Sequence, residues 1–227
     1  MNKDLPKFVW LLLPIVIAAM PYVARFISLD SDRYMFTESG VIENITVISL
    51  LVAIIATYLF LKSVVRFKIL KIWMVIFLLG SIYYAGEEIS WGQHYFGWAT
   101  PESWTNVNDQ QETNLHNTAA IFDQIPRTLL SIAALIGGVL IPLFRRFKNH
   151  LPNKDSLFDW VFPTYVCLPA ALLSLFVSWH EKFYKLIDIN IPVVLDIRAG
   201  ETKECLLALF MMMYALSIWY RNKNVNN

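Results

Sequence analysis

Charged residues are scarce in this chain. Asp, Glu, Lys and Arg make up 16% of its 227 residues, whereas soluble domains carry roughly 25%. Hydrophobic residues make up 56%, and the mean hydropathy is positive, at +0.47. So little polar surface cannot cover a globule in water. The composition therefore excludes a soluble domain and predicts an integral membrane protein.

Signals for nucleic acids and for thiol chemistry are also missing. The net charge is only +1, and the chain has no basic tract, no Gly-rich phosphate loop and no zinc-finger spacing, so we expect no nucleic-acid partner. The two cysteines, Cys167 and Cys205, fall in apolar runs at different expected depths. We expect small buried side chains there, with neither a disulfide nor a metal pair.

Apolar residues come in six runs, each near the roughly 20 residues that span a bilayer as a helix. No Lys, Arg, Asp or Glu lies in the central part of any run. We predict an all-α fold, a polytopic bundle of six transmembrane helices in one domain, residues 1–227. The first span should stay uncleaved, because no good signal-peptidase site follows it. The predicted spans are residues 8–28, 41–61, 69–89, 127–144, 159–179 and 204–220.

The basic residues predict the orientation of the bundle. Twelve of the 19 basic residues lie in segments 1–7, 62–72, 145–158 and 221–227, which places these segments and both termini in the cytoplasm. Of the 18 acidic residues, 15 then lie outside or at the outer boundary. Acidic residues contribute little to orientation, so their bias indicates a polar cap on the outer face. We expect a multi-pass protein of the plasma (inner) membrane.

The longest outer loop, residues 90–126, has the composition of an interfacial segment. Trp91, Tyr95 and Trp98 are spaced four and three residues apart, on one face if the segment is helical. An aromatic stripe of this kind is typical of a segment at headgroup depth.

Two tandem glutamates, Glu87 and Glu88, mark the outer end of the third span. A carboxylate costs roughly 3 kcal/mol at the bilayer centre and much less at the interface, so the pair fixes the helix end. Consecutive helical residues point about 100° apart, and we therefore expect one glutamate to turn into the bundle. The alternative is a solvated helix end, although acids there oppose the helix dipole.

A second polar cluster is the string NDQQETNLHN, residues 108–117. If this segment is helical, Glu112, His116 and Asp123 share one face. A Glu and a His one turn apart can bind a metal ion or form a base and its orienting carboxylate. An ordinary ion pair on a helix surface is the alternative.

Further acids and a histidine lie at the ends of the fifth and sixth spans. His180 ends the fifth span, and Glu201 and Glu204 open the sixth, where acids also suit the helix dipole. Carboxylates and imidazoles at one rim suit Zn, Mn or Fe, and they equally suit general acid–base work. The candidate ligands of such a divalent metal are Glu88, Glu112, His116, His180 and Glu204.

The strings EEISWGQ and ETNLHN, within residues 86–117, resemble a pattern shared by an uncharacterised family of bacterial multi-spanning membrane proteins. The resemblance implies a bacterial membrane protein and no mechanism. Members often carry a basic residue where this chain has His94, which weakens a ligand role for it. Ser90 and His94 also have the Ser-x-x-x-His spacing of ceramidase-like zinc hydrolases, but their paired His-x-x-x-His and a seventh span are missing. The positions matching the family pattern are Glu87, Glu88, Ser90, Trp91, Gln93, Glu112, Asn114, His116 and Asn117.

Three functions stay open at this point. The first is a metal-assisted hydrolase or transferase acting on a lipid or lipid-linked substrate. The second is a non-catalytic subunit (a sensor, assembly factor or interaction partner of another membrane protein or of a second copy) whose polar cluster is a structural lock. A transporter is less favoured, because the charges stop at the rim rather than the midplane. The candidate catalytic residues are Glu87, Glu88, Glu112, His116 and His180.

Overall fold

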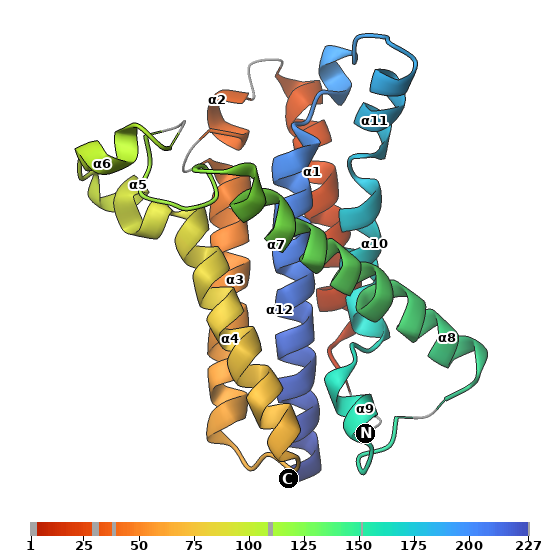
Figure 1. Ribbon diagram of the computed structural model, residues 1–227. Coiled ribbons are helices and arrows are strands. Elements are labelled where there is room, and N and C mark those ends of the chain that lie inside the picture. The colour runs from red at the N-terminus through yellow and green to blue at the C-terminus, as the bar shows by residue number, and fades with distance from the viewer. Residues whose placement is uncertain (1–3, 29–31, 38–39, 109–110, 151, 227) are drawn as a thin grey trace.

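The computed structural model of the protein describes residues 4–28, 32–37, 40–108, 111–150 and 152–226 (Figure 1). In these ranges the regular elements are all helical, and six helices are long and apolar enough to cross a membrane. The six predicted spans are confirmed as helices, and the last three are longer than predicted. The spans are Phe8–Ile27, Val41–Lys62, Lys68–Glu88, Ala120–Phe147, Leu157–Leu186 and Val193–Val225.

Several spans are assembled from shorter elements that follow one another. The second and third spans are the single helices α3 (Val41–Lys62) and α4 (Lys68–Glu88). The first consists of η1 (Phe8–Leu12) and α1 (Leu13–Ile27), and the fourth of α7 (Ala120–Ala133), η3 (Ala134–Leu140) and α8 (Ile141–Phe147). The fifth contains α9 (Leu157–Val161), η4 (Tyr165–Cys167), α10 (Leu168–Phe176) and α11 (Trp179–Leu186), and the sixth contains η5 (Val193–Leu195) and α12 (Ala199–Asn226). The outer loops add α2 (Asp32–Met35), η2 (Ser90–Gly92), α5 (Gln93–Phe96) and α6 (Glu102–Thr105).

Helix α12 forms the centre of the bundle (Figure 1). A helix that is apolar on all sides lies either in lipid or inside a bundle, and Leu206, Met213 and Ile218 of α12 are fully buried by other parts of the protein. Close packing against it depends on Gly138 in η3. A Cβ there would lie 2.5 Å from the Cβ of Ala171 and 2.8 Å from the ring of Phe210. The glycine therefore lets the fourth span approach α10 and α12.

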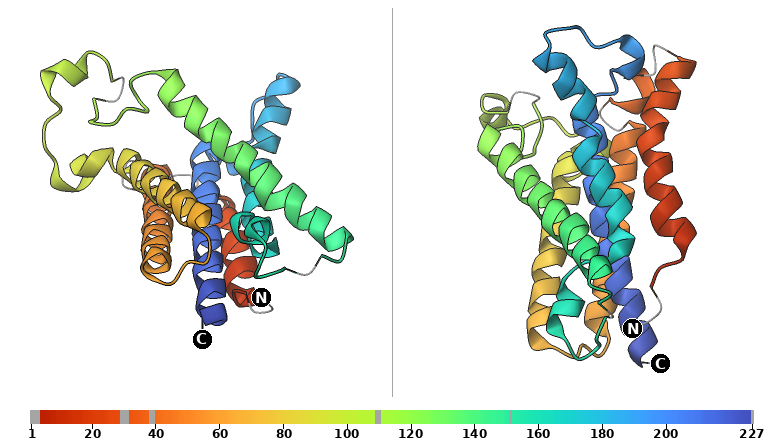
Figure 2. Two further views of the ribbon diagram at one scale, coloured as in Figure 1. Left: turned by 60° about the horizontal axis from the view of Figure 1, so that its bottom comes forward. Right: turned by 90° about the vertical axis from the view of Figure 1, so that its right-hand side faces the viewer.

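Both ends of the chain lie at the same end of the bundle, which we call the inner end after the predicted orientation (Figure 1). The opposite, outer end carries the polar loops. Helices α5 and α6 project sideways from the end of α4 (Figure 2). Tyr95, Phe96 and Trp98 are exposed there. The predicted stripe does not lie on one helical face, because α5 ends at Phe96 and the ring of Trp91 turns back over Gly86. The interfacial position stays a prediction.

A sharp turn ends helix α4. Ser90, Trp91 and Gly92 all have positive φ, at 46°, 56° and 108°, a left-handed conformation that non-glycine residues adopt rarely. The turn brings the ring of Trp91 back over Gly86, where a Cβ would lie 2.8 Å from that ring. The segment GEEISWG therefore reverses the chain directly after the two glutamates.

Candidate functional site

Glu87 ties the end of α4 to the loop that precedes α7. Its carboxylate accepts hydrogen bonds from the indole N–H of Trp91 (2.7 Å) and from the backbone N–H groups of Leu115 (2.7 Å) and His116 (2.8 Å). The Nδ1 atom of His116 lies 3.4 Å from the same carboxylate, whose side chain is 5% exposed. This glutamate is therefore held by protein donors rather than by water.

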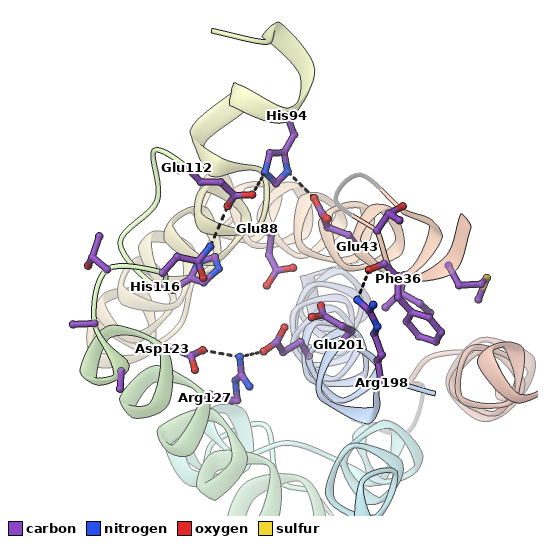
Figure 3. A pocket seen from close by; sticks show the side chains of 18 residues that line it. Phe36, Glu43, Glu88, His94, Glu112, His116, Asp123, Arg127, Arg198 and Glu201 are labelled. Atoms are coloured by element: carbon purple, nitrogen blue, oxygen red, sulfur yellow. Dashed lines mark hydrogen bonds and ion pairs between the residues drawn. The ribbon is translucent and has the colours of Figure 1, made fainter. Parts of the chain in front are cut away.

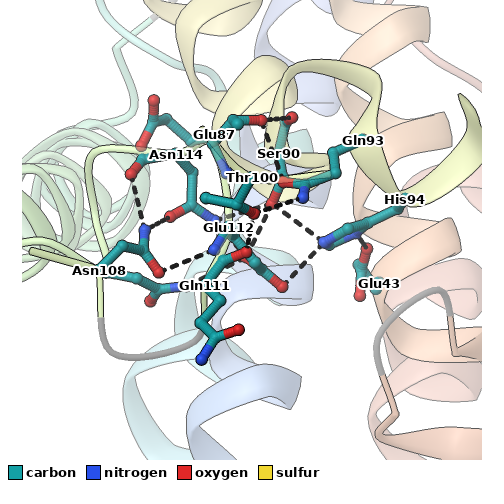
Figure 4. Close-up of polar contacts among 12 residues, drawn as sticks. Glu43, Glu87, Ser90, Gln93, His94, Thr100, Asn108, Gln111, Glu112 and Asn114 are labelled. Atoms are coloured by element: carbon teal, nitrogen blue, oxygen red, sulfur yellow. Dashed lines mark hydrogen bonds and ion pairs between the residues drawn. The ribbon is translucent and has the colours of Figure 1, made fainter. Parts of the chain in front are cut away.

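His94 lies between two carboxylates (Figure 4). Its Nδ1 is 2.9 Å from Glu43 Oε1, and its Nε2 is 2.9 Å from Glu112 Oε1. Hydrogen bonds to Glu112 and Glu43 raise the pKa of His94 to about 10, against the opposing effect of burial. Burial alone would raise the pKa of Glu112, but hydrogen bonds from His94 and Ser90 hold it at about 2. At neutral pH the site is an imidazolium between carboxylates, which joins the loop to α3 and is no general base.

Ser90 is not placed to act as a nucleophile. The residue is fully buried, and its Oγ donates to Glu112 Oε2 (2.7 Å) and accepts from Asn114 Nδ2 (2.8 Å). His94 Nε2 lies 3.0 Å from the same Oγ. Because His94 is already protonated at neutral pH, it cannot take the Ser90 proton. The Ser-x-x-x-His pair therefore has a structural role.

Amides complete the connection between the two strings EEISWGQ and ETNLHN. The Oε1 of Gln93 accepts from the backbone N–H of Thr113 (2.7 Å), and the Thr113 hydroxyl donates to the Ser90 carbonyl (2.9 Å). The Oδ1 of Asn108 accepts from the backbone N–H of Glu112 (3.0 Å). We call the residues joined in this way the loop network. It consists of Glu43, Glu87, Ser90, Gln93, His94, Asn108, Glu112, Thr113 and Asn114.

The predicted helical pairing of Glu112 with His116 is wrong. The chain between Gln111 and Ala119 forms turns and irregular structure, and α7 begins only at Ala120. Glu112 turns toward His94, whereas His116 faces Glu87. The side chains of the loop network bind the backbone N–H groups of this segment, so that it follows their positions rather than a helical path.

An open polar cavity of about 860 Å³ lies beside the loop network at the outer end (Figure 3). Carboxylates outnumber arginines in its lining. Glu88 points into the cavity (Figure 3), and among the described residues its carboxylate has no hydrogen-bond or ion-pair partner. The charged lining residues other than histidines are Glu43, Glu88, Glu112, Asp123, Arg127, Arg198, Glu201 and Glu204.

Arg127 connects α7 to α12 across the wall of this cavity. Its Nη2 lies 2.6 Å from Asp123 Oδ1, one helical turn earlier, and also pairs with Glu204 on α12. The Glu204 side chain is 13% exposed. The arginine therefore neutralises part of the acidic lining and fixes the start of α7.

An apolar groove of about 370 Å³ adjoins the polar cavity. It lies between α4, α7 and α12, which contribute Gly80, Leu130 and Met211 among others. A Cβ placed on Gly80 would meet nothing within 4 Å, so the groove is open at that point. Cavity and groove together make one amphipathic site with a common wall. The residues that line both are Glu88, His116, Asp123, Arg127 and Glu204.

His180 does not join this site, contrary to the prediction. Its Nε2 lies 2.8 Å from the carbonyl oxygen of Leu195, and its Nδ1 lies 3.4 Å from the Tyr22 hydroxyl. It lines neither the polar cavity nor the apolar groove. The neighbouring Glu181 accepts from the backbone N–H of Ala199 (2.7 Å). The start of α11 thus fastens to α1 and to the segment before α12.

The geometry gives no support to the predicted divalent-metal site. Within the ranges that the structure describes, no group of three or more His, Cys, Asp and Glu side chains is placed to hold a metal ion. The predicted ligands have separate partners instead: Glu112 contacts His94, Glu204 contacts Arg127, and His180 lies elsewhere.

Sequence reasoning misses two residues of the site. His94 holds Glu43 and Glu112 together, and its only local signal is the four-residue spacing from Ser90. Arg127 lies in the wall common to cavity and groove. Its signal in the sequence is its position one helical turn after Asp123, at the start of an apolar run.

Comparisons of the chain with models of protein families, with curated proteins and with solved structures find no match. The resemblance to the EEISWGQ…ETNLHN family stays a prediction.

Proposed function

We propose that this protein is an enzyme of a bacterial plasma (inner) membrane, a hydrolase or transferase that acts on a lipid or lipid-linked substrate at the outer surface. The wall common to the polar cavity and the apolar groove carries this proposal. A lipid would place its chain in the groove and its head in the cavity. The bond between chain and head would then lie at the common wall.

Glu87 and His116 supply a base and its orienting carboxylate. His116 lines both cavity and groove, and its Nδ1 lies 3.4 Å from Glu87 Oε2. A proton on Nδ1 is favoured by that carboxylate and leaves Nε2 as the acceptor. This pairing takes the role that the sequence suggested for Glu112 and His116.

A reaction at this wall follows from these positions. The Nε2 of His116 takes a proton from water or from a hydroxyl nucleophile, whose oxygen attacks an ester carbon or a phosphorus of the lipid. The imidazolium then returns the proton to the leaving oxygen. Arg127, in the same wall, stabilises the negative charge that develops.

A second function is favoured by the loop network. Its buried polar atoms are closely bonded to one another around an imidazolium, which suits a structural lock in a non-catalytic membrane subunit. The two functions differ in one respect: a lock depends on His94 and an enzyme depends on His116.

Turnover of lipids by the purified protein tests the enzyme. In nanodiscs made from total bacterial lipid, mass spectrometry over time should show a lipid consumed and a product formed. His116→Gln should lower that rate by about 10²-fold or more, with little change in melting temperature. His150→Gln, at the inner end, is the matched control and should be as active as the parent. Unchanged lipids with the parent protein, or full activity in His116→Gln, would contradict the proposal.

The orientation is part of the same proposal and is supported by the distribution of basic residues. In a cysteine-free background, Asn106→Cys in the outer loop should react with an impermeant maleimide added to intact cells, and Lys148→Cys should react only after lysis. The reverse pattern would place the cavity on the cytoplasmic side.

A further inference from the structure

The polar cavity has an excess of negative charge. Six carboxyl groups line it, and the cationic lining groups are Arg127, Arg198 and the His94 imidazolium, which leaves a formal charge of −3 when all six carboxyl groups are ionised. Arg127 pairs with Asp123 and Glu204, and His94 pairs with Glu43 and Glu112. The remaining charged groups are Glu88, Glu201 and Arg198, which donates to the carbonyl oxygen of Phe36 (3.3 Å) and whose charge acts on Glu201.

Glu88 is the lining carboxylate whose charge is least compensated. It is partly buried at the end of α4, and its carboxylate faces the open cavity without a hydrogen-bond or ion-pair partner among the described residues. Glu201 points toward the same space from α12 (Figure 3). Two carboxylates that face the same space repel each other, so a cation placed between these two side chains would be stabilised.

The lining also indicates which kind of cation fits. Phe36 is the one Phe, Tyr or Trp that lines the polar cavity in the described part of the chain, so the aromatic cage typical of quaternary ammonium sites is missing. Carboxylates accept the three N–H bonds of a primary ammonium. The apolar groove opens beside the same carboxylates, with Arg127 between them.

We propose that the site binds an amphiphile whose head carries a primary ammonium, as in an aminophospholipid. The ammonium contacts Glu88 and Glu201, a phosphate lies beside Arg127, and an acyl chain occupies the groove along Gly80. This inference rests on the proposed function, because it assumes that the amphipathic site takes a lipid.

Native mass spectrometry of the purified full chain with single lipids tests this. Phosphatidylethanolamine should bind about tenfold more tightly than phosphatidylglycerol with the same acyl chains, and also more tightly than phosphatidylcholine. Glu88→Gln and Glu201→Gln should each reduce the preference for phosphatidylethanolamine. Glu102→Gln, on the exposed helix α6, is the matched control and should keep it.

A second variant pair tests the groove. Gly80→Leu adds a side chain where a Cβ would meet nothing within 4 Å and should weaken all three lipids. Gly200→Leu, where a Cβ also meets nothing within 4 Å, should not. Equal binding of phosphatidylethanolamine and phosphatidylglycerol would overturn the ammonium site and leave the proposed enzyme standing. Binding of neither lipid would overturn both. Binding of Mg²⁺ that displaces phosphatidylethanolamine and is lost in Glu88→Gln would assign the carboxylates to a free cation instead.

Discussion

Charged side chains have different surroundings at the two ends of the bundle. At the inner end, the Asp159 carboxylate is 2% exposed and has Arg145 at 2.8 Å, His150 at 2.9 Å and the backbone N–H of Asn153 at 2.9 Å. Arg221, also buried, donates to the Asp159 carbonyl (2.9 Å). At the outer end, six carboxylates and two arginines surround an open cavity.

This difference separates structural charge from charge that is available to a ligand. A buried carboxylate with cations and N–H donors around it is part of the packing, and its removal leaves the opposite charges unpaired. A carboxylate that faces open space contributes repulsion with its like-charged neighbours. The loop network lies at the outer end but resembles the inner end in this respect, because its imidazolium has a carboxylate on each side.

The largest loss of stability is expected at the inner end. Asp159→Ala should lower the free energy of unfolding by about 3–5 kcal/mol, because Arg145 loses its buried carboxylate partner and the backbone N–H of Asn153 loses its acceptor. Asp155→Ala is the control: its pair with Arg66 is about half exposed, and the loss should be about 0–1 kcal/mol. Thermal unfolding in one detergent measures both. Equal losses would remove the distinction between the two pairs.

The second-largest loss of stability is expected in the loop network, and this loss should depend on pH. His94→Gln should cost about 2–4 kcal/mol near pH 6. The pKa of His94 is about 10 in the folded protein, against an ordinary value of 6.5. Its contribution to stability is therefore complete below pH 6.5 and is lost as the pH rises toward 10. Glu112, at about 2 against 4.5, contributes above pH 4.5 and loses this as the pH falls toward 2.

The difference in melting temperature between parent and His94→Gln should therefore be greatest between pH 4.5 and 6.5 and shrink toward pH 10. A difference that grows with pH would mean that His94 is neutral in the fold.

A double-mutant cycle sharpens the assignment of partners within the outer end. Glu112→Gln and His94→Ala should be coupled by about 1–3 kcal/mol, because the two side chains are in contact. Glu112→Gln and His116→Ala should be nearly additive, within about 0.5 kcal/mol. Strong coupling of the second pair, measured by thermal unfolding, would restore the helical pairing that the structure contradicts.

The smallest effect is expected at Glu88. Glu88→Gln should leave stability unchanged or raise it by up to about 1 kcal/mol, since it removes a charge that is repelled by Glu204 and Glu201 and has no ion-pair partner among the described residues. The same change should reduce the preference for phosphatidylethanolamine. A loss of several degrees in melting temperature would show that Glu88 has a structural partner.

The spans could be predicted because they depend on local composition. A run of about 20 apolar residues forms a helix in lipid whatever its neighbours are, and all six runs are helical in the structure. The ends of the spans were harder to predict. Helix α7 begins at Ala120 rather than at residue 127, because polar residues such as Asp123 and Arg127 pair with each other inside the helix.

The candidate site could be predicted in part. The tandem glutamates and the ETNLHN string indicated the right region, because charge at a span boundary is rare and visible. Their partners could not be read from the sequence. Glu43 and His94 are separated by 51 residues, and His116 contacts the carboxylate of Glu87, 29 residues earlier, through its backbone N–H. Helical periodicity relates only close neighbours, so it paired Glu112 with His116 and grouped His180 with both.

The bond between Glu87 and the backbone of residues 115 and 116 also has a consequence for biosynthesis. Glu87 leaves the ribosome 28 and 29 residues before the two N–H groups that bind it. At roughly 5–20 residues per second, this is an interval on the order of a few seconds. During that time the third helix has entered the membrane with its outer end unsecured, and the left-handed turn at Ser90–Gly92 has no loop to hold it. We therefore expect the outer end of the nascent third helix to be least fixed in position until the ETNLHN segment has been synthesised.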